Sequence, residues 1–469
     1  MILDEITPSL NLVTVNGRLS WSTVNGTDPI HLKAKQVYVR AGELLIGNET
    51  HPFETDAEIT LYGNRKEASL VMAGSFETGN KLLLNTGLVK FFGKPRDRHT
   101  RLQTSVYRDY DSTTVETGLD WVTGDQLYFA PTNHQWQHSE YRTVEEYNSQ
   151  TGLLKVNEPF NFYHYGDFTS SAAKYNGVDI RGEVRLLSRN VRVAGSETNE
   201  EWGGNILTLD RMEFDGSVRQ GTTQLDHVEV VNCGQKNTFN AAIRFEYTGA
   251  KRDSFVRNSV VHNSHAWSLY ITASKSITIE SSDFIGAKAV GVNLNSIANV
   301  TLDSIFVGDV QKREWTGLDQ SLDKEACVAF CSYFPNNKCF DSKITNSITA
   351  GCPFAGYVVP GHDCVDSVSK FDGNVAHSGE RVGAHIYPDP ASSRSGACYM
   401  GSNFAAYKNR DGGLTTMYKT KELRMENMTF IDNQKGVCLQ TAGEGEKIEI
   451  KMRDVEIYGE SDSQDAPEG

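Results

Sequence analysis

The chain has 469 residues, of which 38% are hydrophobic, so it is long enough to bury a sizeable core and to form two or three structural units. Its 60 acidic residues outnumber its 46 basic ones and give a net charge of −14 at pH 7. This balance argues against a nucleic-acid partner, because such binding rests on a cationic surface. An acidic surface also matches an anionic polysaccharide poorly, unless one local groove is basic. No run of eighteen apolar residues occurs, so we expect no membrane span in this chain.

The first two hundred residues have the pattern of closely spaced β-strands. Over residues 1–100, short apolar strands alternate with glycines, which supply the positive φ that tight turns need. Regular glycine spacing with strands suits a β-solenoid and a β-sandwich equally well, and we expect one β-domain there. Residues 101–204 are interpreted as a β-rich connecting region, with aromatic clusters around Trp121 and from Phe160 to Tyr165.

From about residue 205 a short phrase returns: an aliphatic residue, a polar one, then Asn, Asp or Ser, then small or β-branched residues. It begins at Val256, Ile279 and Leu302, at a constant spacing of 23 residues. Looser copies occur at residues 344–347, 425–430 and 452–457. A period in the low twenties with short β-rich segments indicates one solenoid turn per copy. No apolar run of helical period separates the copies, which argues against helical repeats.

The predicted fold is therefore all-β: a right-handed parallel β-helix over residues 205–460, preceded by the β-rich domain. A cysteine-rich insertion (311–342) and a loop (387–421) interrupt its coils, and residues 461–469 resemble a linker. Because each coil buries its apolar face by stacking on its neighbours, the repeats predict two inward columns. These columns are Val256, Ile279 and Leu302, and Val261, Phe284 and Val307.

The same register places ionisable residues on neighbouring coils. Glu280 would lie next to Asp303, and stacked coils bring such carboxylates to the separation that retaining glycosidases use. The favoured interpretation is an exposed charge ladder that Arg257 completes. Asn258 and its repeat partners Ser281 and Ser304 are expected to satisfy turn backbone.

Several histidines are further candidates for chemistry. His262 and His265, with His227 upstream, could act as a general base or bind a metal, but a ligand set at defined spacing is missing. His362, Asp363 and His377 form a second group, for which structural hydrogen bonding is favoured. We predict no metal site and no cofactor. Four aromatic residues could stack on sugar rings, although packing is the commoner role: Trp202, Trp267, Tyr270 and Trp315.

The eight cysteines and four glycosylation sequons favour an oxidising, extracytoplasmic compartment. Disulfides are favoured over zinc because the cluster lacks a Cys-X-X-Cys pair. The disulfide candidates are Cys327, Cys331, Cys339, Cys352 and Cys364, with Cys398 as a possible outside partner. Cys233 and Cys438 are expected to be free and buried. The sequons are Asn25, Asn48, Asn299 and Asn427.

The N-terminus has neither the charged nor the apolar region of a signal peptide. We therefore interpret the chain as a piece of a longer secreted or membrane-anchored protein that has lost its leader. The first β-domain is accordingly expected to be incomplete at its N-terminus.

Longer phrases resemble a known family. Residues 118–127 and 186–195 resemble the segments that follow the G8 domain, a glycine-rich extracellular module. Residues 361–364, 374–378, 387–391 and 401–408 resemble the parallel β-helix region of fibrocystin and its fibrocystin-like homologue. These phrases occur in the family's order. The resemblance implies a G8-like domain at residues 1–100 and a large receptor-like ectodomain on a cilium, flagellum or cell surface.

The same architecture is found in the cell-migration-inducing, hyaluronidase-like proteins, which resemble this chain more distantly. Those relatives have an apolar-His-Phe-His phrase where this chain has Arg244 and Glu246, and an Arg and a His where it has Trp267 and Thr272. Since the departures fall on ionisable residues, we expect a non-catalytic module that presents loops to protein or glycan partners. The alternative is a polysaccharide-degrading enzyme, with Glu246, His262, His265, Glu280, Asp303, His362, Asp363 and His377 as its candidates.

Overall fold

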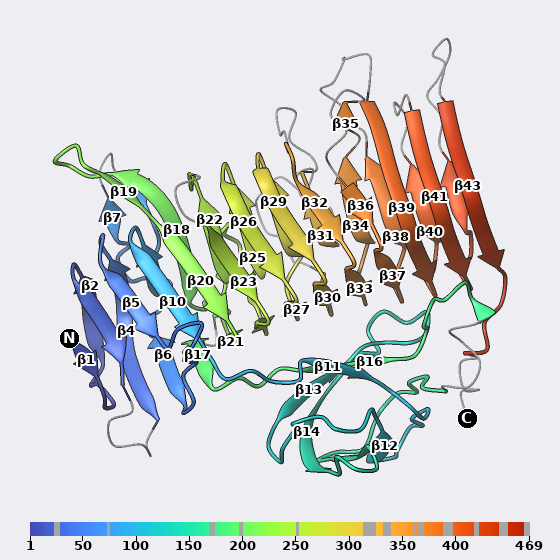
Figure 1. The fold of residues 1–469 in the computed structure, drawn as a ribbon, viewed down its shortest axis with the longest axis horizontal. Helices are drawn as coiled ribbons and strands as arrows, with labels where there is room; N and C mark the ends of the chain where they lie inside the picture. Colours follow the sequence, from blue (N-terminus) through green and yellow to red (C-terminus); the bar gives the residue numbers. More distant parts are fainter. Residues whose placement is uncertain are drawn as a thin grey trace.

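The computed structural model describes most of the chain. The described residues are 1–22, 29–72, 76–167, 174–196, 200–249, 253–312, 325–331, 339–360, 362–363, 370–387, 397–416, 422–439 and 449–463. Apart from the single helical residue Lys174, their secondary-structure elements are strands. Figure 1 shows these strands stacked side by side along a rod, with the N-terminus at one end.

The rod is a parallel β-helix with three faces, so the expected all-β solenoid is confirmed. Face 1 is formed by β1 (Ile2–Leu3), β3 (Arg18–Trp21), β5 (Glu43–Ile46), β10 (Leu88–Phe92), β20 (Thr222–Asp226), β23 (Ser254–Arg257), β26 (Lys275–Glu280), β29 (Ala298–Asp303), β32 (Lys343–Thr345) and β36 (Lys370–Asp372).

Face 2 is formed by β6 (Ala57–Leu61), β17 (Val191–Gly195), β21 (Val228–Val231), β24 (Val260–His262), β27 (Asp283–Ile285), β30 (Phe306–Gly308), β33 (Ile348–Ala350) and β37 (Val375–His377). Face 3 is formed by β9 (Leu82–Asn85), β18 (Asn205–Met212), β22 (Ile243–Glu246), β25 (Leu269–Thr272), β28 (Val290–Asn295), β31 (Ala326–Phe330), β34 (Ala355–Pro360), β38 (Val382–Tyr387), β40 (Gly412–Thr416) and β42 (Val437–Leu439).

Some longer strands continue from one face to the next. Faces 1 and 2 share β39 (Ala397–Tyr407), β41 (Glu422–Ile431) and β43 (Glu449–Tyr458), and faces 2 and 3 share β2 (Leu10–Val15) and β4 (Ile30–Val39). Short strands lie outside this pattern: β7 (Val71–Met72), β8 (Phe76–Glu77), β19 (Val218–Gln220) and β35 (His362–Asp363).

The strands of residues 1–100 are coils of this same rod. Strand β10 pairs in parallel with β5 on one side and with β20 on the other, and β17 lies between β6 and β21. The N-terminal region is thus continuous with the later coils. The rod therefore starts well before residue 205, where the sequence analysis placed its first coil.

An antiparallel excursion leaves the rod after β10 and returns at β17. Its strands are β11 (His99–Arg101), β12 (Ser112–Thr114), β13 (Gln126–Phe129), β14 (Glu140–Tyr147), β15 (Leu153–Val156) and β16 (Glu183–Leu186). It has its own apolar core and lies along the rod beneath face 2 (Figure 1). The connecting region expected at residues 101–204 overlaps this excursion, but the excursion already includes β11 from His99, and the expected region also takes in β17, a strand of the rod.

The repeated phrase sets the register of the coils, as predicted. Val256 pairs with Ile279 and Ile279 with Leu302, and all three side chains are fully buried. Val261, Phe284 and Val307 form the second predicted inward column. Both columns belong to the main apolar core.

The Asn, Asp or Ser of each phrase occupies the sharp turn between faces 1 and 2. Asn258, Ser281, Ser304 and Asn346 all have φ between 46° and 54°. This left-handed conformation strains most side chains, but Asn and Asp tolerate it because their short polar groups bond to nearby backbone. The expected turn position is confirmed, but the side chains of Asn258 and Asn346 bond to Asp226 and Asp303 rather than to turn backbone. The serine that follows each turn residue bonds to the backbone instead: Ser259, Ser282 and Ser347.

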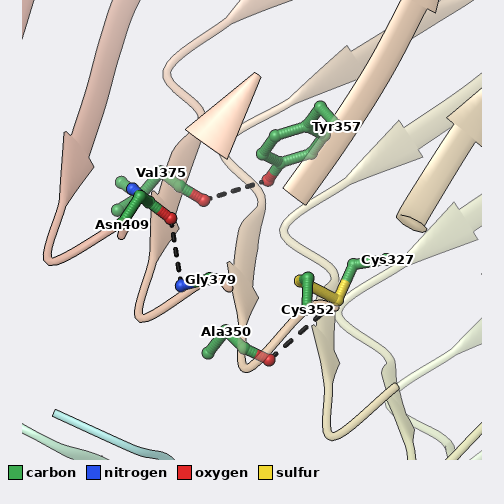
Figure 2. The surroundings of a disulfide bond; sticks show 7 residues. All are labelled: Cys327, Ala350, Cys352, Tyr357, Val375, Gly379 and Asn409. Carbon is green, nitrogen blue, oxygen red and sulfur yellow. Dashed lines mark hydrogen bonds between the residues drawn. A yellow bond between two sulfur atoms is a disulfide. The ribbon is translucent and has the colours of Figure 1, made fainter. Parts of the chain in front are cut away.

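Two disulfides strengthen the coils around the cysteine-rich insertion, as expected. Cys327 pairs with Cys352, linking β31 to the turn after β33 on the next coil, with 5.6 Å between the Cα atoms. Cys331 pairs with Cys339. In Figure 2 the first disulfide lies beside the core, where the Tyr357 hydroxyl donates to the Val375 carbonyl at 3.2 Å.

Two of the other cysteines, Cys233 and Cys438, are free thiols. Cys233 is free and buried, as expected, whereas the free Cys438 is only half-buried. Cys364 and the side chain of Cys398 lie outside the described residues.

Candidate functional site

A pocket of about 330 Å³ opens where the coils turn from face 2 to face 3. Its lining comes from the same turn on successive coils: Lys236, His265, Lys288 and Lys312. Backbone bonds hold these turns in register, since the Lys288 amide donates to Ala266 at 2.9 Å. Because stacked strands are spaced about 4.8 Å apart, the pocket extends along the rod axis across several coils.

The pocket is locally basic on an acidic protein. Its lining includes Lys236, Lys288 and Lys312 but only one carboxylate, Glu201. Glu201 forms an ion pair with Lys236 and lies 3.9 Å from the Lys288 amine. These amines and the carboxylate are about one-third exposed, so a bound anion could reach them.

Lys312 lies at the end of the same row of turns. Its amine is 2.7 Å from the Glu380 carboxylate, which is not part of the lining. The Lys312 side chain is half exposed, and its amine lies 5.7 Å from the centre of the Trp136 ring. Trp136 of the excursion thus lies next to Lys312 without lining the pocket.

His265 contributes a neutral imidazole to this pocket at neutral pH. Burial lowers the pKa of His265 below its usual 6.5, and the nearby Lys81, Lys288 and Lys236 lower it further, against the opposing effect of Glu201. A neutral imidazole both donates and accepts hydrogen bonds. His265 therefore adds hydrogen-bonding capacity without adding charge.

Trp267 forms the apolar wall of the pocket. Its ring lies 5.0 Å from Tyr270 and 5.6 Å from Phe239, and only 3% of the residue is exposed. Burial raises the pKa of Tyr270, so its phenol stays protonated. Of the aromatic residues proposed for sugar stacking, Trp267 is the one that lines the pocket; Trp315 lies outside the described residues.

Face 3 next to the pocket has a buried polar column. Glu246 accepts from Arg244 through Nε at 2.9 Å and Nη2 at 2.7 Å, and both residues are less than 10% exposed. Arg244 also lies within hydrogen-bonding distance of the Asn205 side chain. The Glu246 carboxylate is therefore ion-paired with Arg244, and this pairing disfavours a role for Glu246 as a general base.

Glu280 and Asp303 are Cα partners on adjacent coils, as the register predicted. Asp303 accepts hydrogen bonds from Asn346 at 2.9 Å, from Ser304 at 3.0 Å and from Thr345. Burial alone would raise the pKa of Asp303, but these donors lower it. Arg257 does not complete a ladder through Glu280: its bonds go to Asp226 and Glu49, both at 2.7 Å.

His262 and His377 each end a strand of face 2, and neither lines the pocket. The Nε2 atom of His262 is 3.1 Å from Glu229, and that of His377 is 3.1 Å from Glu183. The His377 ring also stacks on Tyr407 at 4.5 Å. Both histidines are buried; His377 joins the rod to the excursion through Glu183, whereas Glu229, the partner of His262, lies on β21 of the rod itself.

The structure does not group His362 and Asp363 with His377. The first two form β35, which pairs with β39 in antiparallel fashion, whereas His377 ends β37 on face 2. Nothing is described of the His362 and Asp363 side chains. No group of metal ligands occurs among the described residues.

Three of the four sequon asparagines are described, and all three are exposed: Asn48, Asn299 and Asn427. Asn48 accepts hydrogen bonds from the Thr50 hydroxyl at 2.8 Å and from its amide at 3.0 Å. Asn427 donates to Asn403 at 2.7 Å and accepts from Asn176 at 3.1 Å. Asn25 lies outside the described residues.

The pocket lysines were missed by the sequence analysis. Lys288 and Gln311 are 23 residues apart, the same spacing as the repeated phrase, so the repeat could have placed them on one turn. Lys236 and Glu201 carry no such signal, because the segments between their coils differ in length. Only the folded chain brings them to the pocket.

Comparison with known proteins identifies the N-terminal coils. Residues 1–103 match the family model of the G8 domain. The chain is 23% identical to fibrocystin of Canis lupus familiaris over 442 residues, which is 91% of this chain and 10% of that protein. It is 21% identical to fibrocystin-L of Homo sapiens over 422 residues, 86% of this chain and 10% of that protein. The chain thus spans about a tenth of the length of these relatives.

A more distant relative is the cell migration-inducing and hyaluronan-binding protein of Mus musculus. It is 23% identical over 445 residues, covering 76% of this chain and 32% of that protein. Among solved structures, a tailspike of a Pseudomonas phage is similar with a TM-score of 0.25 and 10% identity, over 90% of this chain and 71% of that one. The expected resemblance to the fibrocystin and fibrocystin-like proteins, and more distantly to the cell-migration-inducing proteins, is confirmed.

Proposed function

We propose that this chain is a non-catalytic, extracellular recognition module of a fibrocystin-like surface protein. Its rigid β-helix presents the turns between faces 2 and 3, and the pocket there binds an acidic saccharide. The row of Lys236, Lys288 and Lys312 beside Trp267 is the observation that carries the proposal.

The chemistry of the pocket fits this ligand class. Ammonium groups attract carboxylates or sulfates, and a partly exposed site makes that attraction salt-sensitive. Trp267, of which only 3% is exposed, supports the pocket from behind, so the ligand contacts come from the amines and His265. The three lysines also form the local basic groove that an acidic protein needs in order to bind an anionic polymer. One relative is named for hyaluronan binding, which supports testing uronate-containing polymers first.

Two disulfides fit an oxidising compartment outside the cytoplasm. The described residues include no helix that is long and apolar enough to cross a bilayer. From the disulfides and the similarity to the fibrocystins, we propose that the module lies on a cell coat, cilium or flagellum as part of a larger protein. Immunolabelling of intact, unpermeabilised cells would locate it, and staining that requires permeabilisation would contradict this location.

The binding proposal is tested by calorimetric titration with size-defined hyaluronan, chondroitin sulfate and a neutral oligosaccharide. We expect binding of at least one acidic chain, weakened at least tenfold in Lys236→Ala/Lys288→Ala and weakened by added salt. Lys451→Ala is the matched control, since that lysine is also exposed and paired with a glutamate but lies on the last coil.

Equal binding by the double variant and the control would overturn the pocket as the site. In the same samples the length of the polymer is followed by gel filtration. We expect no shortening. Shortening that Glu246→Gln abolishes would replace the non-catalytic function with a polysaccharide-degrading one.

A further inference from the structure

A cluster of three tyrosines on the excursion forms an open aromatic corner. The rings of Tyr107 and Tyr110 are perpendicular, with centroids 6.0 Å apart, and Tyr163 lies 5.4 Å from Tyr107. Tyr107 and Tyr110 are 51% and 58% exposed. Large aromatic residues are normally covered in a folded domain, so two adjacent exposed rings indicate a contact surface.

Backbone bonds on both sides hold this corner in shape. Val106 exchanges amide–carbonyl bonds with His164 at 2.8 and 3.0 Å. The Asp109 amide donates to Phe160 at 2.8 Å, and the Phe160 amide donates back to Tyr110 at 2.8 Å. The rings are therefore preorganised, which reduces the ordering cost of binding.

Acidic side chains flank the rings. Asp109, between the two exposed tyrosines in the sequence, is 87% exposed and takes the left-handed conformation, with φ of 68°. Asp111 is also exposed. Arg108 is 76% exposed and its nearest approach to Asp109 is 4.0 Å. Lys155 lies near Asp111 but is paired with Glu145 at 3.1 Å, so both carboxylates are only weakly neutralised.

We propose that this corner, Tyr107, Asp109, Tyr110, Asp111 and Tyr163, binds an arginine or lysine side chain on an exposed segment of a partner protein. A cation is attracted to the faces of aromatic rings, and more so beside a carboxylate. Because the face of an aromatic ring is its negative side, a flat guanidinium would stack on an exposed ring face of this pair. This site is on the excursion and is separate from the saccharide pocket.

The test uses the full chain and a capped pentapeptide with two arginines between glycines. The comparison peptide has citrulline in place of arginine, which keeps the shape and removes the charge. Calorimetry should detect binding of the arginine peptide, at least tenfold weaker binding of the citrulline peptide, and at least tenfold loss in Tyr107→Ala/Tyr110→Ala. Because that double variant keeps the net charge, its loss of binding isolates the rings from general attraction to an acidic protein.

Tyr247→Ala is the matched control, since Tyr247 is also a 59% exposed tyrosine but lies on the rod. Circular dichroism confirms that each variant is folded. Asp109→Asn/Asp111→Asn should weaken the arginine peptide severalfold. Binding that is equal in the wild type and the tyrosine double variant, or no binding at all, would overturn the proposal. Preference for the citrulline peptide would do so as well.

Discussion

Glu183 of the excursion lies 3.1 Å from Nε2 of His377 on face 2, with both side chains essentially removed from solvent. The same carboxylate is 2.9 Å from Nη2 of Arg101. Nearby, Asp283 of the rod is 3.2 Å from Arg98 and 3.5 Å from Arg185, both on the excursion. The excursion is thus held on face 2 by buried charge pairs as well as by apolar contacts.

This interface predicts an acid-sensitive excursion. Burial alone would raise the pKa of Glu183, but Arg101 and His377 hold it well below its usual range. Likewise, hydrogen bonds from His164 and the Asn161 amide outweigh burial and lower the pKa of Glu140 from 4.5 to about 2. A carboxylate with a depressed folded pKa stabilises the fold above its unfolded pKa, and the contribution is lost as pH falls toward the folded pKa.

We therefore expect the excursion to loosen between about pH 4.5 and pH 2 before the rod does, although the rod also contains a buried carboxylate of lowered pKa, Glu229. Hydrogen exchange measured by mass spectrometry at several pH values can follow the two parts separately. Loss of protection in both parts at one pH would contradict this prediction. Glu183→Gln should move the transition of the excursion to higher pH, whereas the exposed Glu456→Gln should not.

The inward column predicts a large cost for one buried charge. Ile279→Asp should destabilise the protein by several kcal/mol, because the carboxylate would enter a fully apolar core without a partner. Thr278→Asp, at the exposed neighbouring position, should change stability by about 0.5 kcal/mol or less. Denaturant unfolding measures both, and similar costs at the two positions would contradict the assigned register.

The disulfide between Cys327 and Cys352 should stabilise the rod near the insertion. Its removal in Cys327→Ser/Cys352→Ser is expected to cost about 2–4 kcal/mol, because the bond closes a loop of 25 residues in the unfolded chain. Thermal unfolding of the oxidised protein gives the difference. Cys233→Ser serves as the control for a buried cysteine outside any disulfide. Mass spectrometry that finds eight free thiols in native material would refute both pairings.

Glycosylation should favour Asn48 over Asn427. The Asn48 amide nitrogen is left to solvent while its oxygen accepts from Thr50, whereas the Asn427 amide nitrogen is engaged by Asn403. Glycopeptide analysis of the protein from its native source should find glycan at Asn48 at higher occupancy than at Asn427. A higher occupancy at Asn427 than at Asn48 would show that these contacts do not govern glycosylation. A chain without any glycan would indicate that the four sequons occur by chance.

The buried pair of face 3 predicts a stability effect without an effect on saccharide binding. Glu246→Ala leaves the Arg244 charge buried without its partner, which typically costs about 3–5 kcal/mol. Denaturant unfolding checks the cost, and calorimetry on the folded fraction checks the binding. Exposed Glu426→Ala is the control. A variant of unchanged stability that loses binding would show that Glu246 belongs to the site instead.

The local pattern of the sequence determined the fold class and the register of the middle coils. The 23-residue phrase places one aliphatic residue per coil at the same position, which predicts that the Ile279 side chain points into the core. The short polar residue that follows two positions later predicts a turn at Ser281, where φ is positive. The disulfide pairing of Cys327 with Cys352 remained open, because spacing alone does not fix connectivity.

Only the tertiary structure decided how the coils of residues 1–100 continue into the later ones, with β10 beside β20 across the excursion. It also brought Glu183 to His377 and Glu201 to Lys236. These contacts join segments whose intervening loops differ in length from coil to coil, so no periodicity predicts them. The sequence determines what repeats within one coil, whereas packing between distant segments determines which irregular residues meet.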